Sequence, residues 1–361
     1  MKKVYRFSLE RKKTTVFLKK NYKEYLSELL LNKFSDNNFS GVIYFDKKLK
    51  TRANLLKVDL EKNGAKVLLI PAPSGEKSKD IDQCVLVLKK MFRFGIHRKS
   101  FFITLGGGSV GDSGGWIASQ YQRGIAWINI PTTLLSLVDS AYGGKTALNF
   151  DDCKNIIGSI YQPEFIFIDL SFICTLSYRE CYSALGEVFK YGFIFDYNFL
   201  IKVFEKKDKL LKRNETEWRK VILSCLSYKM DLVLKDEKDD SGIREQLNLG
   251  HTFAHGLEGG SNLKIPHGLA VVYGLLFSIH LSYLRGKISL FQRDEYLNFL
   301  SDYSFNDLKK NISKNKVWNS MKKDKKNKGQ GVKVLGLARI GKVISIESVQ
   351  KKEFDLIWRI L

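Results

Sequence analysis

The sequence predicts an α/β domain followed by a mostly helical domain. In the first half of the chain, short β-rich runs alternate with runs of helical length, which is typical of a parallel sheet. Strand signals nearly stop after Asp169, and long helical segments dominate from there to about Met321. A length of 361 residues fits two domains, which we place at residues 1–170 and 171–361.

The elements of the first domain follow one another at short intervals. We expect strands at Thr14–Leu18, Gly41–Asp46, Lys66–Pro71 and Ser100–Leu105, and helices at Tyr22–Leu31, Leu49–Asn63 and Ser78–Phe94. The second of these strands ends in an acid, and the last leads into a glycine turn. No repeat of fixed period runs through the chain, which argues against a solenoid.

The glycine turn reads GGGSVGD and spans Gly106–Asp112. It satisfies the pattern G-x-G-x-x-G between a strand and a helix, the setting in which this pattern indicates a dinucleotide site. Backbone N–H groups in such a turn can approach a pyrophosphate, and the helix start adds positive potential. A tight turn without a ligand is the alternative. The acid available for the ribose, Asp46, precedes the turn, which disfavours an ordinary Rossmann dehydrogenase.

Three of the five histidines lie in one short segment: His251, His255 and His267. A helix over HTFAHGLE places the first two on one face, with Glu258 one turn further on. His267 opens a second, apolar helix, whose start the fold can bring back to His251. The cluster can hold a divalent cation or pass protons, although a single histidine on an apolar helix is usually a core residue.

A zinc site open to substrate needs about three protein ligands, so a carboxylate from elsewhere in the chain should be the third donor. The spacing is not that of H-E-x-x-H, because Thr252 occupies the place of the glutamate. Glu187 in the segment EVFKYG is the candidate donor, and Lys190 follows it on the same helical face. An ordinary surface ion pair between these two residues is the alternative.

The net charge of +22 raises the question of nucleic acid. The lysines are spread along helices and thicken only between Lys309 and Lys328, without an RNP-type aromatic motif or a zinc finger. We therefore expect no specific nucleic-acid partner, and attraction of small anionic substrates instead. Cations and amides beside glycine-rich turns suit a polyanionic substrate. They are Arg123, then Lys145 in the segment that also carries Asp139, and then Lys154 with Asn155.

The cysteine pattern indicates a reduced, cytoplasmic protein. The five cysteines are scattered, odd in number and without C-x-x-C pairing.

The N-terminus has basic residues but no apolar core of a signal peptide. The most apolar run begins at Gly268 and is broken by His280, so we expect no membrane-spanning segment and no membrane partner.

Taken together, these residues resemble the 3-dehydroquinate synthase family of sugar phosphate cyclases. The matching segments run in family order from about residue 74 to 329: PSGEKSK, RKSFFITLGGGSVGD, YQRG, NIPTTLLSLVDSAYGGKTALN, KNIIGSIYQP, LSYRECYSALGEVFKYGFI, REQLNLGHTFAHGLE, PHGLAVVYG and MKKDKKNKG. The resemblance implies an NAD-binding α/β domain with a parallel sheet, a mostly α-helical metal-binding domain, an active site in the cleft between them, and a homodimer.

The resemblance also implies roles for single residues. The ligands of one divalent metal, zinc in the first place and cobalt as the alternative, are Glu187, His251 and His267. The catalytic residues are His255, which handles protons without binding the metal, and Asp139, Lys145, Asn155 and Lys190. Substrate contacts are Arg123, Lys154, Lys229, Arg244, Asn248, Lys325 and Lys326, of which Arg123 reaches the substrate of the partner subunit. NAD contacts are Asp46, Glu76, Lys79, Gly107, Gly108, Asp112, Thr132, Thr133, Thr175 and Leu176.

The family reaction converts 3-deoxy-D-arabino-heptulosonate 7-phosphate to 3-dehydroquinate and phosphate. It proceeds by transient oxidation with NAD, phosphate elimination, re-reduction and aldol closure. Alternatives on the same fold are a cyclase of the aminodehydroquinate, 2-deoxy-scyllo-inosose or 2-epi-5-epi-valiolone synthase type, and a metal-dependent polyol dehydrogenase. A basic binding scaffold without activity is the alternative from another class.

A cluster of cations favours a substrate that carries a carboxylate. Arg244 and Asn248 are four positions apart just before the HTFAH segment, so we expect them to share one face of its helix and to point toward the metal. The planar fork of arginine suits a carboxylate, and Lys229 with Lys325 or Lys326 would add charge.

Overall fold

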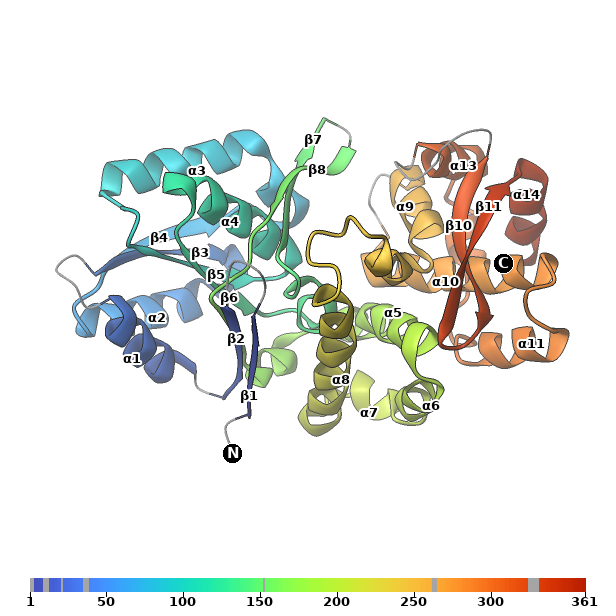
Figure 1. Cartoon of the computed structure of the whole chain (residues 1–361), viewed down its shortest axis with the longest axis horizontal. Helices are drawn as coiled ribbons and strands as arrows, with labels where there is room; N and C mark the ends of the chain where they lie inside the picture. The colour runs from blue at the N-terminus through green and yellow to red at the C-terminus, as the bar shows by residue number, and fades with distance from the viewer. Residues whose placement is uncertain are drawn as a thin grey trace. The chain divides into compact units, whose positions relative to one another are not determined.

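The computed structural model describes residues 3–8, 13–20, 22–34, 39–151, 153–261, 265–323 and 331–361. The chain divides into two compact units, Met1–Leu176 (unit 1) and Ser177–Leu361 (unit 2) (Figure 1). Lys325 and Lys326, two of the predicted substrate contacts, lie outside the described residues.

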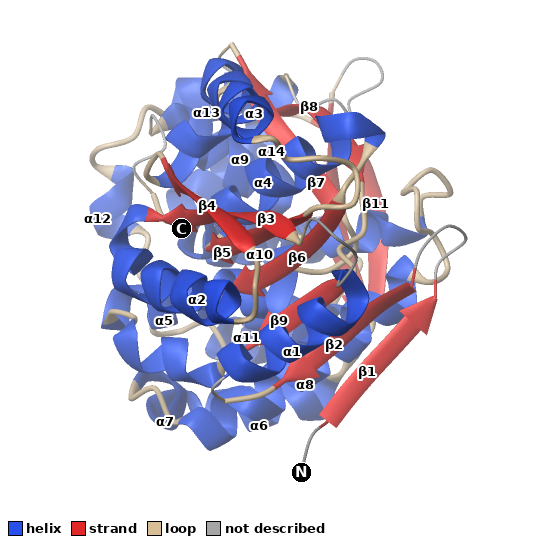
Figure 2. Cartoon of the chain, turned by 90° about the vertical axis from the view of Figure 1, so that its left-hand side faces the viewer, coloured by secondary structure: helices blue, strands red, loops and turns tan. Residues whose placement is uncertain are grey.

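The centre of unit 1 is a seven-stranded sheet with the order β1-β2-β9-β6-β5-β3-β4. Its strands are β1 (Lys3–Ser8), β2 (Lys13–Leu18), β3 (Ser40–Asp46), β4 (Lys66–Ala72), β5 (Phe101–Gly106), β6 (Ala126–Pro131) and β9 (Phe165–Ile168). β1 runs antiparallel to β2 at one end of the sheet, and the other pairs are parallel (Figure 2). The predicted parallel sheet is therefore confirmed.

Helices cover both faces of this sheet. α1 (Tyr22–Phe34) and α2 (Lys50–Lys62) lie on one face, and α3 (Ile81–Phe94) and α4 (Gly108–Gln120) lie on the other (Figure 1). Along β3, Ile43 and Phe45 belong to the first core, whereas Val42 and Tyr44 belong to the second. Because successive side chains of a strand point to opposite faces, a strand covered on both sides is apolar throughout.

The crossover helices change face between the neighbouring strands β3 and β5. α2 follows β3 on one face of the sheet, and α4 follows β5 on the other. The carboxyl ends of these two strands therefore form a topological switch point, which is where ligands bind in open α/β sheets. Phe45 pairs with Leu105, and Asp46 therefore lies at the same edge as the glycine turn. This pairing allows an acid that precedes the turn in sequence to share a site with it.

Two helices begin later than the sequence predicts. 3₁₀ turns at Lys47–Leu49 (η1) and Gly75–Lys79 (η2) occupy the predicted helix starts. The Asp46 carboxylate accepts a hydrogen bond from the backbone N–H of Lys48 at 2.9 Å, and Asp80 accepts one from Gln83 at 2.9 Å. An aspartate that caps backbone N–H groups in this way fixes where the turn ends and the helix begins.

A hairpin that the sequence did not predict leaves the sheet after β6. Its strands are β7 (Lys145–Phe150) and β8 (Cys153–Ile160), which pair only with each other in the described part of unit 1. Three short helical segments complete this unit: η3 (Tyr121–Arg123), the π-helical η4 (Ser136–Ser140) and η5 (Leu170–Thr175).

Unit 2 is mostly helical, as predicted. Its helices are α5 (Tyr178–Phe195), α6 (Tyr197–Glu205), α7 (Lys207–Leu211), α8 (Glu215–Val233), η6 (Ile243–Asn248), α9 (His251–Gly260), α10 (His267–Leu284), α11 (Leu290–Asn298), α12 (Asn306–Lys309), α13 (Lys314–Lys322) and α14 (Lys351–Ile360). An antiparallel hairpin of β10 (Val332–Arg339) and β11 (Lys342–Val349) was not anticipated. β10 is mostly buried and packs against α9 and α10.

α10 is the central helix of unit 2. By length and composition it is the one helix among the described residues that could cross a membrane, but 78% of it is buried inside the unit. It packs against α5, α9, α11, α14 and β10. The helix continues through the buried His280 without a break, contrary to the expectation that this residue interrupts the apolar run. A helix that is apolar all round and enclosed by neighbours is a core helix.

Two glycine contacts bring α5 and α9 close to α10. A Cβ atom on Gly186 of α5 would lie 1.9 Å from the carbonyl oxygen of Gly268 in α10. A Cβ atom on Gly274 of α10 would likewise lie 1.9 Å from the carbonyl oxygen of Gly250, which precedes α9. Only glycine permits backbones to approach this closely. The three elements are therefore fixed relative to one another at these contacts.

The first prediction concerns the start of α5. Ser177 caps this helix: its hydroxyl accepts from the N–H of Glu180 at 3.3 Å, while the Glu180 carboxylate accepts from the N–H of Ser177 at 2.7 Å. Ser177→Ala should lower the free energy of unfolding by about 1 kcal/mol, because it removes one half of this capping box. Urea unfolding measures the change. Ser177→Thr, which keeps the hydroxyl, is the control, and equal urea midpoints for all three proteins would contradict the prediction.

Candidate functional site

Unit 2 brings together three side chains that can bind a metal ion. Glu187 lies on α5, whereas His251 and His267 are the first residues of α9 and α10. One ligand atom of each residue lies within 4.8 Å of the other two. The Nε2 atoms of His251 and His267 lie 3.5 Å and 3.1 Å from Oε1 of Glu187. The structure thus assembles the three residues that the sequence analysis singled out as metal ligands.

The second nitrogen of each histidine ring faces an oxygen atom. Nδ1 of His251 lies 3.3 Å from the carbonyl oxygen of Leu249, and Nδ1 of His267 lies 3.3 Å from Oε1 of Glu258. A neutral imidazole that donates from Nδ1 keeps its lone pair on Nε2. With both rings neutral and protonated at Nδ1, the two Nε2 atoms would present lone pairs at the same point, beside the Glu187 carboxylate.

This donor set fits a divalent zinc-like ion. Metal–ligand bonds of about 2.1 Å at tetrahedral angles separate neighbouring ligand atoms by about 3.4 Å, and the two separations from Oε1 of Glu187, 3.5 Å and 3.1 Å, bracket that value. Two imidazoles and one carboxylate also leave a fourth position for a substrate or a water molecule. Glu258 behind His267 supplies the outer carboxylate that commonly orients a histidine ligand.

The charges around Glu187 keep it ionised. Burial raises the pKa of this carboxyl group, but Lys190 and the two histidines outweigh that effect and hold the pKa well below its usual value. The ammonium group of Lys190 lies 2.5 Å from Oε2 of Glu187, and both side chains are almost fully buried. The two residues therefore form a buried ion pair and not a surface one. Lys190 contacts Oε2 of Glu187, whereas the two histidines face Oε1.

His255 lies close to this group without joining it. It is exposed on α9, and its ring centre is 5.5 Å from that of His251 and 6.5 Å from that of His267. An exposed imidazole at this distance can exchange protons with solvent while the other two histidines hold a metal.

The predicted carboxylate-binding residues of unit 2 occupy positions other than those expected. Arg244 and Asn248 lie in the separate 3₁₀ helix η6, not on α9, because Gly250 with φ of 79° turns the chain between the two helices. Arg244 is buried, and its Nη1 atom donates to the carbonyl oxygens of Glu237 and Asp236 at 2.9 Å and 3.4 Å. Lys229 is buried on α8.

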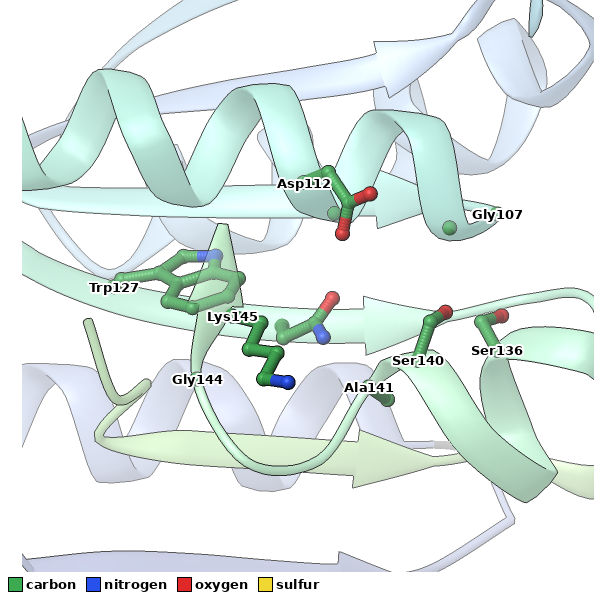
Figure 3. Close-up of a pocket in the computed structure, with 11 residues that line it drawn as sticks. Gly107, Asp112, Trp127, Ser136, Ser140, Ala141, Gly144 and Lys145 are labelled. Atoms are coloured by element: carbon green, nitrogen blue, oxygen red, sulfur yellow. The ribbon is translucent and has the colours of Figure 1, made fainter. Parts of the chain in front are cut away.

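The glycine turn of unit 1 lines a small pocket (Figure 3). Gly107 and Asp112 of the α4 region lie on one side of it, and Ser136 and Ser140 of η4 lie on the other. A Cβ atom on Gly107 would lie 2.9 Å from Cγ2 of Thr133, and one on Gly108 would lie 2.9 Å from the Ser140 hydroxyl oxygen. Glycine at both positions keeps this pocket open beside the start of α4.

Several predicted cofactor contacts form one network at this edge of the sheet. The ammonium group of the buried Lys79 donates to Oδ2 of Asp112 at 2.7 Å and also to Oδ1 of Asn155. Oε1 of Glu76 accepts from the hydroxyl group of Ser109 at 3.2 Å. Burial raises the pKa of Glu76, but the cation of Lys79, followed by Asn149, Lys154 and Ser109, outweighs it and leaves the pKa low.

The other predicted residues of unit 1 lie on turns, on short helical segments and on the hairpin β7–β8. Thr132 and Thr133 follow β6 at the same edge as Asp46. Thr175 is the last residue of η5, and Leu176 is the last residue of the unit. Asp139 lies in the π-helical turn η4, while Lys145 and Lys154 lie on the hairpin β7–β8.

Arg123 is exposed at the end of η3 with φ of 64°, next to Gln122 with φ of 52°. Two consecutive non-glycine residues in the left-handed region indicate a strained turn.

Two residues of these sites were not identified as such from the sequence. Glu258 was noted on the histidine face, but its contact with His267 depends on how α9 and α10 pack. Asn149 was not noted at all, and its Nδ2 donates to Oε2 of Glu76 at 2.9 Å. No spacing rule points to Asn149, because its partner Glu76 belongs to a different part of the chain.

Comparisons with known proteins identify the same family over most of the chain. A family model described as 3-dehydroquinate synthase N-terminal matches residues 69–183, and one described as 3-dehydroquinate synthase C-terminal matches residues 184–327. The chain is 42% identical over 257 residues to the 3-dehydroquinate synthase of Alkaliphilus oremlandii, covering 71% of this chain and 70% of that protein. It is 35% identical over 345 residues to that of Endomicrobium trichonymphae, covering 94% and 93%.

The fold is also similar to that of a solved enzyme. A crystal structure of 2-deoxy-scyllo-inosose synthase, complexed with carbaglucose-6-phosphate, NAD+ and Co2+, superimposes with a TM-score of 0.89. The alignment covers 99% of this chain and 100% of that one, at 18% sequence identity. At this identity the similarity supports the fold.

The second prediction tests the three donors. Glu187→Gln, His251→Ala and His267→Ala should each lose stoichiometric metal, because each removes one of three ligands. His255→Ala, on the same helix as His251, is the matched control and should keep the metal. Elemental analysis of the purified variants, with circular dichroism to verify folding, measures this. A folded His267→Ala protein with a full complement of metal would exclude His267 as a ligand.

The third prediction concerns pH. Burial lowers the pKa of His267, but hydrogen bonds with Glu187 and Glu258 outweigh it and raise the pKa to about 10 in the metal-free protein. Such a proton stabilises the metal-free fold below the unfolded pKa of about 6.5, and this stabilisation disappears as the pH rises through the folded value.

A metal ion needs the neutral imidazole, so the proton on His267 competes with it. The affinity for Co2+ should therefore rise with pH by up to about tenfold per unit between pH 6.5 and 8.5. Titration in the presence of a competing chelator, with the chelator's own pH dependence subtracted, measures this. An affinity that is constant over this range would contradict the assigned hydrogen bonds.

Proposed function

The chain belongs to the 3-dehydroquinate synthase family, and on this premise we propose that it converts 3-deoxy-D-arabino-heptulosonate 7-phosphate to 3-dehydroquinate and inorganic phosphate. The observation that carries the proposal is the donor set Glu187, His251 and His267 on three separate helices. A proton and a phosphate group leave neighbouring carbon atoms in this reaction, so the enzyme would be a carbon–oxygen lyase.

The residues of unit 2 would hold the metal and handle protons. Glu187, His251 and His267 would bind one divalent ion, with zinc as the first candidate and cobalt as the second. When bound, such an ion lowers the pKa of a coordinated hydroxyl group. His255, exposed beside His251, would exchange protons between substrate and solvent. Lys190 would keep Glu187 ionised and oriented through their internal ion pair.

The residues of unit 1 would hold NAD. The pocket at the glycine turn offers backbone N–H groups at the start of α4, where the helix dipole favours a pyrophosphate. Asp46 at the end of β3 would bind a ribose hydroxyl. Thr132, Thr133, Thr175 and Leu176 would contact other parts of the cofactor, together with Glu76, Lys79 and Asp112. When bound, NAD accepts a hydride from the substrate and returns it within one turnover.

Cationic residues in each unit suit a substrate with two anionic groups. In unit 1, Arg123, Lys145 and Lys154 lie on turns and on the hairpin, where long side chains can reach a phosphate. In unit 2, Lys229 and Arg244 are buried cations, which favours a site for a second anion such as a carboxylate. Lys325 and Lys326 would add to it, and Asp139 and Asn155 would orient hydroxyl groups. This second cluster argues against a substrate with a phosphate group alone.

Two further parts of the proposal concern assembly and location. Arg123 on its strained turn is exposed, and in a homodimer it would serve the substrate site of the partner subunit. All five cysteines are free thiols, which supports a reducing, cytoplasmic compartment. The predicted absence of specific nucleic-acid and membrane partners remains a prediction.

The fourth prediction separates a cyclase from a polyol dehydrogenase. With heptulosonate phosphate, metal and a small amount of NAD, phosphate should accumulate to many times the NAD supplied, without growth of NADH absorbance. The reason is that each hydride removed from the substrate is returned before release. Phosphate release and absorbance are followed in the same sample. Steady NADH formation in step with substrate loss would indicate a dehydrogenase instead.

The fifth prediction concerns the carboxylate. Arg244→Lys should lower turnover by about tenfold or more, because loss of a charge-assisted bidentate contact costs about 1.5–3 kcal/mol. Arg219→Lys, on the exposed face of α8, is the control and should leave turnover unchanged. Arg244→Lys should lower the turnover of a carboxylate-free sugar phosphate much less. A wild type that prefers glucose 6-phosphate or sedoheptulose 7-phosphate would point to another cyclase.

A further inference from the structure

Asn149 lies at an irregularity of the hairpin β7–β8. Leu148 pairs with Ile157, but Phe150 pairs with Cys153, so the register shifts on either side of Asn149. Bulges of this kind redirect a side chain and are frequent beside active sites. Here the half-buried side chain of Asn149 faces η2, the segment that carries Glu76.

The amide group of Asn149 uses both of its ends. Its Nδ2 donates to Oε2 of Glu76 at 2.9 Å, and its Oδ1 accepts from the backbone N–H of Asn155 at 3.2 Å. A carboxylate can only accept and a backbone N–H can only donate, so the two partners fix which end of the amide is which. Asn149 therefore joins two segments of unit 1 that contain predicted site residues.

The contact with Asn149 supports an uncommon backbone conformation of Asn155. Its φ of 57° lies in the left-handed region, which asparagine enters more readily than most residues but still at some cost. The hydrogen bond from its N–H to Asn149 stabilises that conformation. In this orientation Oδ1 of Asn155 accepts from Lys79, and Lys79 in turn donates to Asp112.

The contacts form one continuous path, from Glu76 through Asn149, Asn155 and Lys79 to Asp112. We propose that Asn149 is a positioning residue, which holds Glu76 for the cofactor and Asn155 for the substrate through a single amide group. This inference rests on the proposed function, in which Glu76 contacts NAD and Asn155 contacts the substrate. A side chain that only secured the hairpin would not need to bind both residues.

The test compares Asn149→Ala with the wild type and with Asn155→Ala. Asn149→Ala should weaken NAD binding by about fivefold and lower kcat by about fivefold, since each lost hydrogen bond contributes roughly 1 kcal/mol. If Asn149 acts on catalysis through Asn155, adding Asn149→Ala to Asn155→Ala should not lower kcat further. Cys153→Ser, exposed on the same hairpin, is the control and should leave both quantities unchanged.

A third measurement does not need turnover. Hydrogen exchange of the peptide that contains Asn155 should be faster in Asn149→Ala than in the wild type or in Cys153→Ser, because the N–H of Asn155 loses its acceptor. If the wild type fails to release phosphate from the heptulosonate, the proposed substrate is wrong, while NAD affinity and hydrogen exchange still test Asn149. Unchanged NAD affinity and exchange, or losses of kcat that multiply in the double variant, would overturn the inference.

Discussion

The metal site depends on how closely three backbones approach one another in unit 2. Each of the three donors is the neighbour of a glycine at a helix contact: Glu187 follows Gly186, His251 follows Gly250 and His267 precedes Gly268. A Cβ atom at the contact of Gly186 with Gly268 would lie 1.9 Å from a backbone oxygen. Larger residues would separate the helices, and the donors attached to them would move apart. The packing of the central helix thus sets the spacing of the ligand atoms.

Burial then determines what these side chains can do. An isolated carboxylate as buried as Glu187 would be costly, so its two oxygens need partners: Lys190 neutralises one, and the imidazoles of His251 and His267 face the other. Leu249 and Glu258 hold the remaining ring nitrogens. Once both rings are neutral, the contacts at Nδ1 leave the two Nε2 lone pairs directed at one point. Unit 1 uses the same principle with Glu76, Lys79 and Asp112, where an internal cation supports acids at the edge of the sheet.

The sequence predicted the features that local patterns encode. Short β-rich runs that alternate with helical runs predicted the parallel sheet, and clustered histidines with Glu187 predicted the donor set. Features that depend on pairing and packing were not predictable: the pairing of β3 with β5 that places Asp46 beside the glycine turn, the hairpin β7–β8 with its bulge at Asn149, and the contact of Glu258 with His267. Arg244 and Asn248 were assigned to the wrong helix, because a spacing of four residues does not reveal that Gly250 turns the chain between η6 and α9.

The most direct test of the packing constraint is the Co2+ affinity of a protein that keeps all three donors. Gly186→Ala leaves Glu187, His251 and His267 in the sequence but places a methyl group against the backbone of α10. Gly259→Ala, where the added methyl group would meet only the rotatable side chain of Ser320, is the control. Calorimetric titration should show at least about tenfold weaker binding for Gly186→Ala and wild-type affinity for Gly259→Ala. A folded Gly186→Ala protein that binds Co2+ as tightly as the wild type would contradict the constraint.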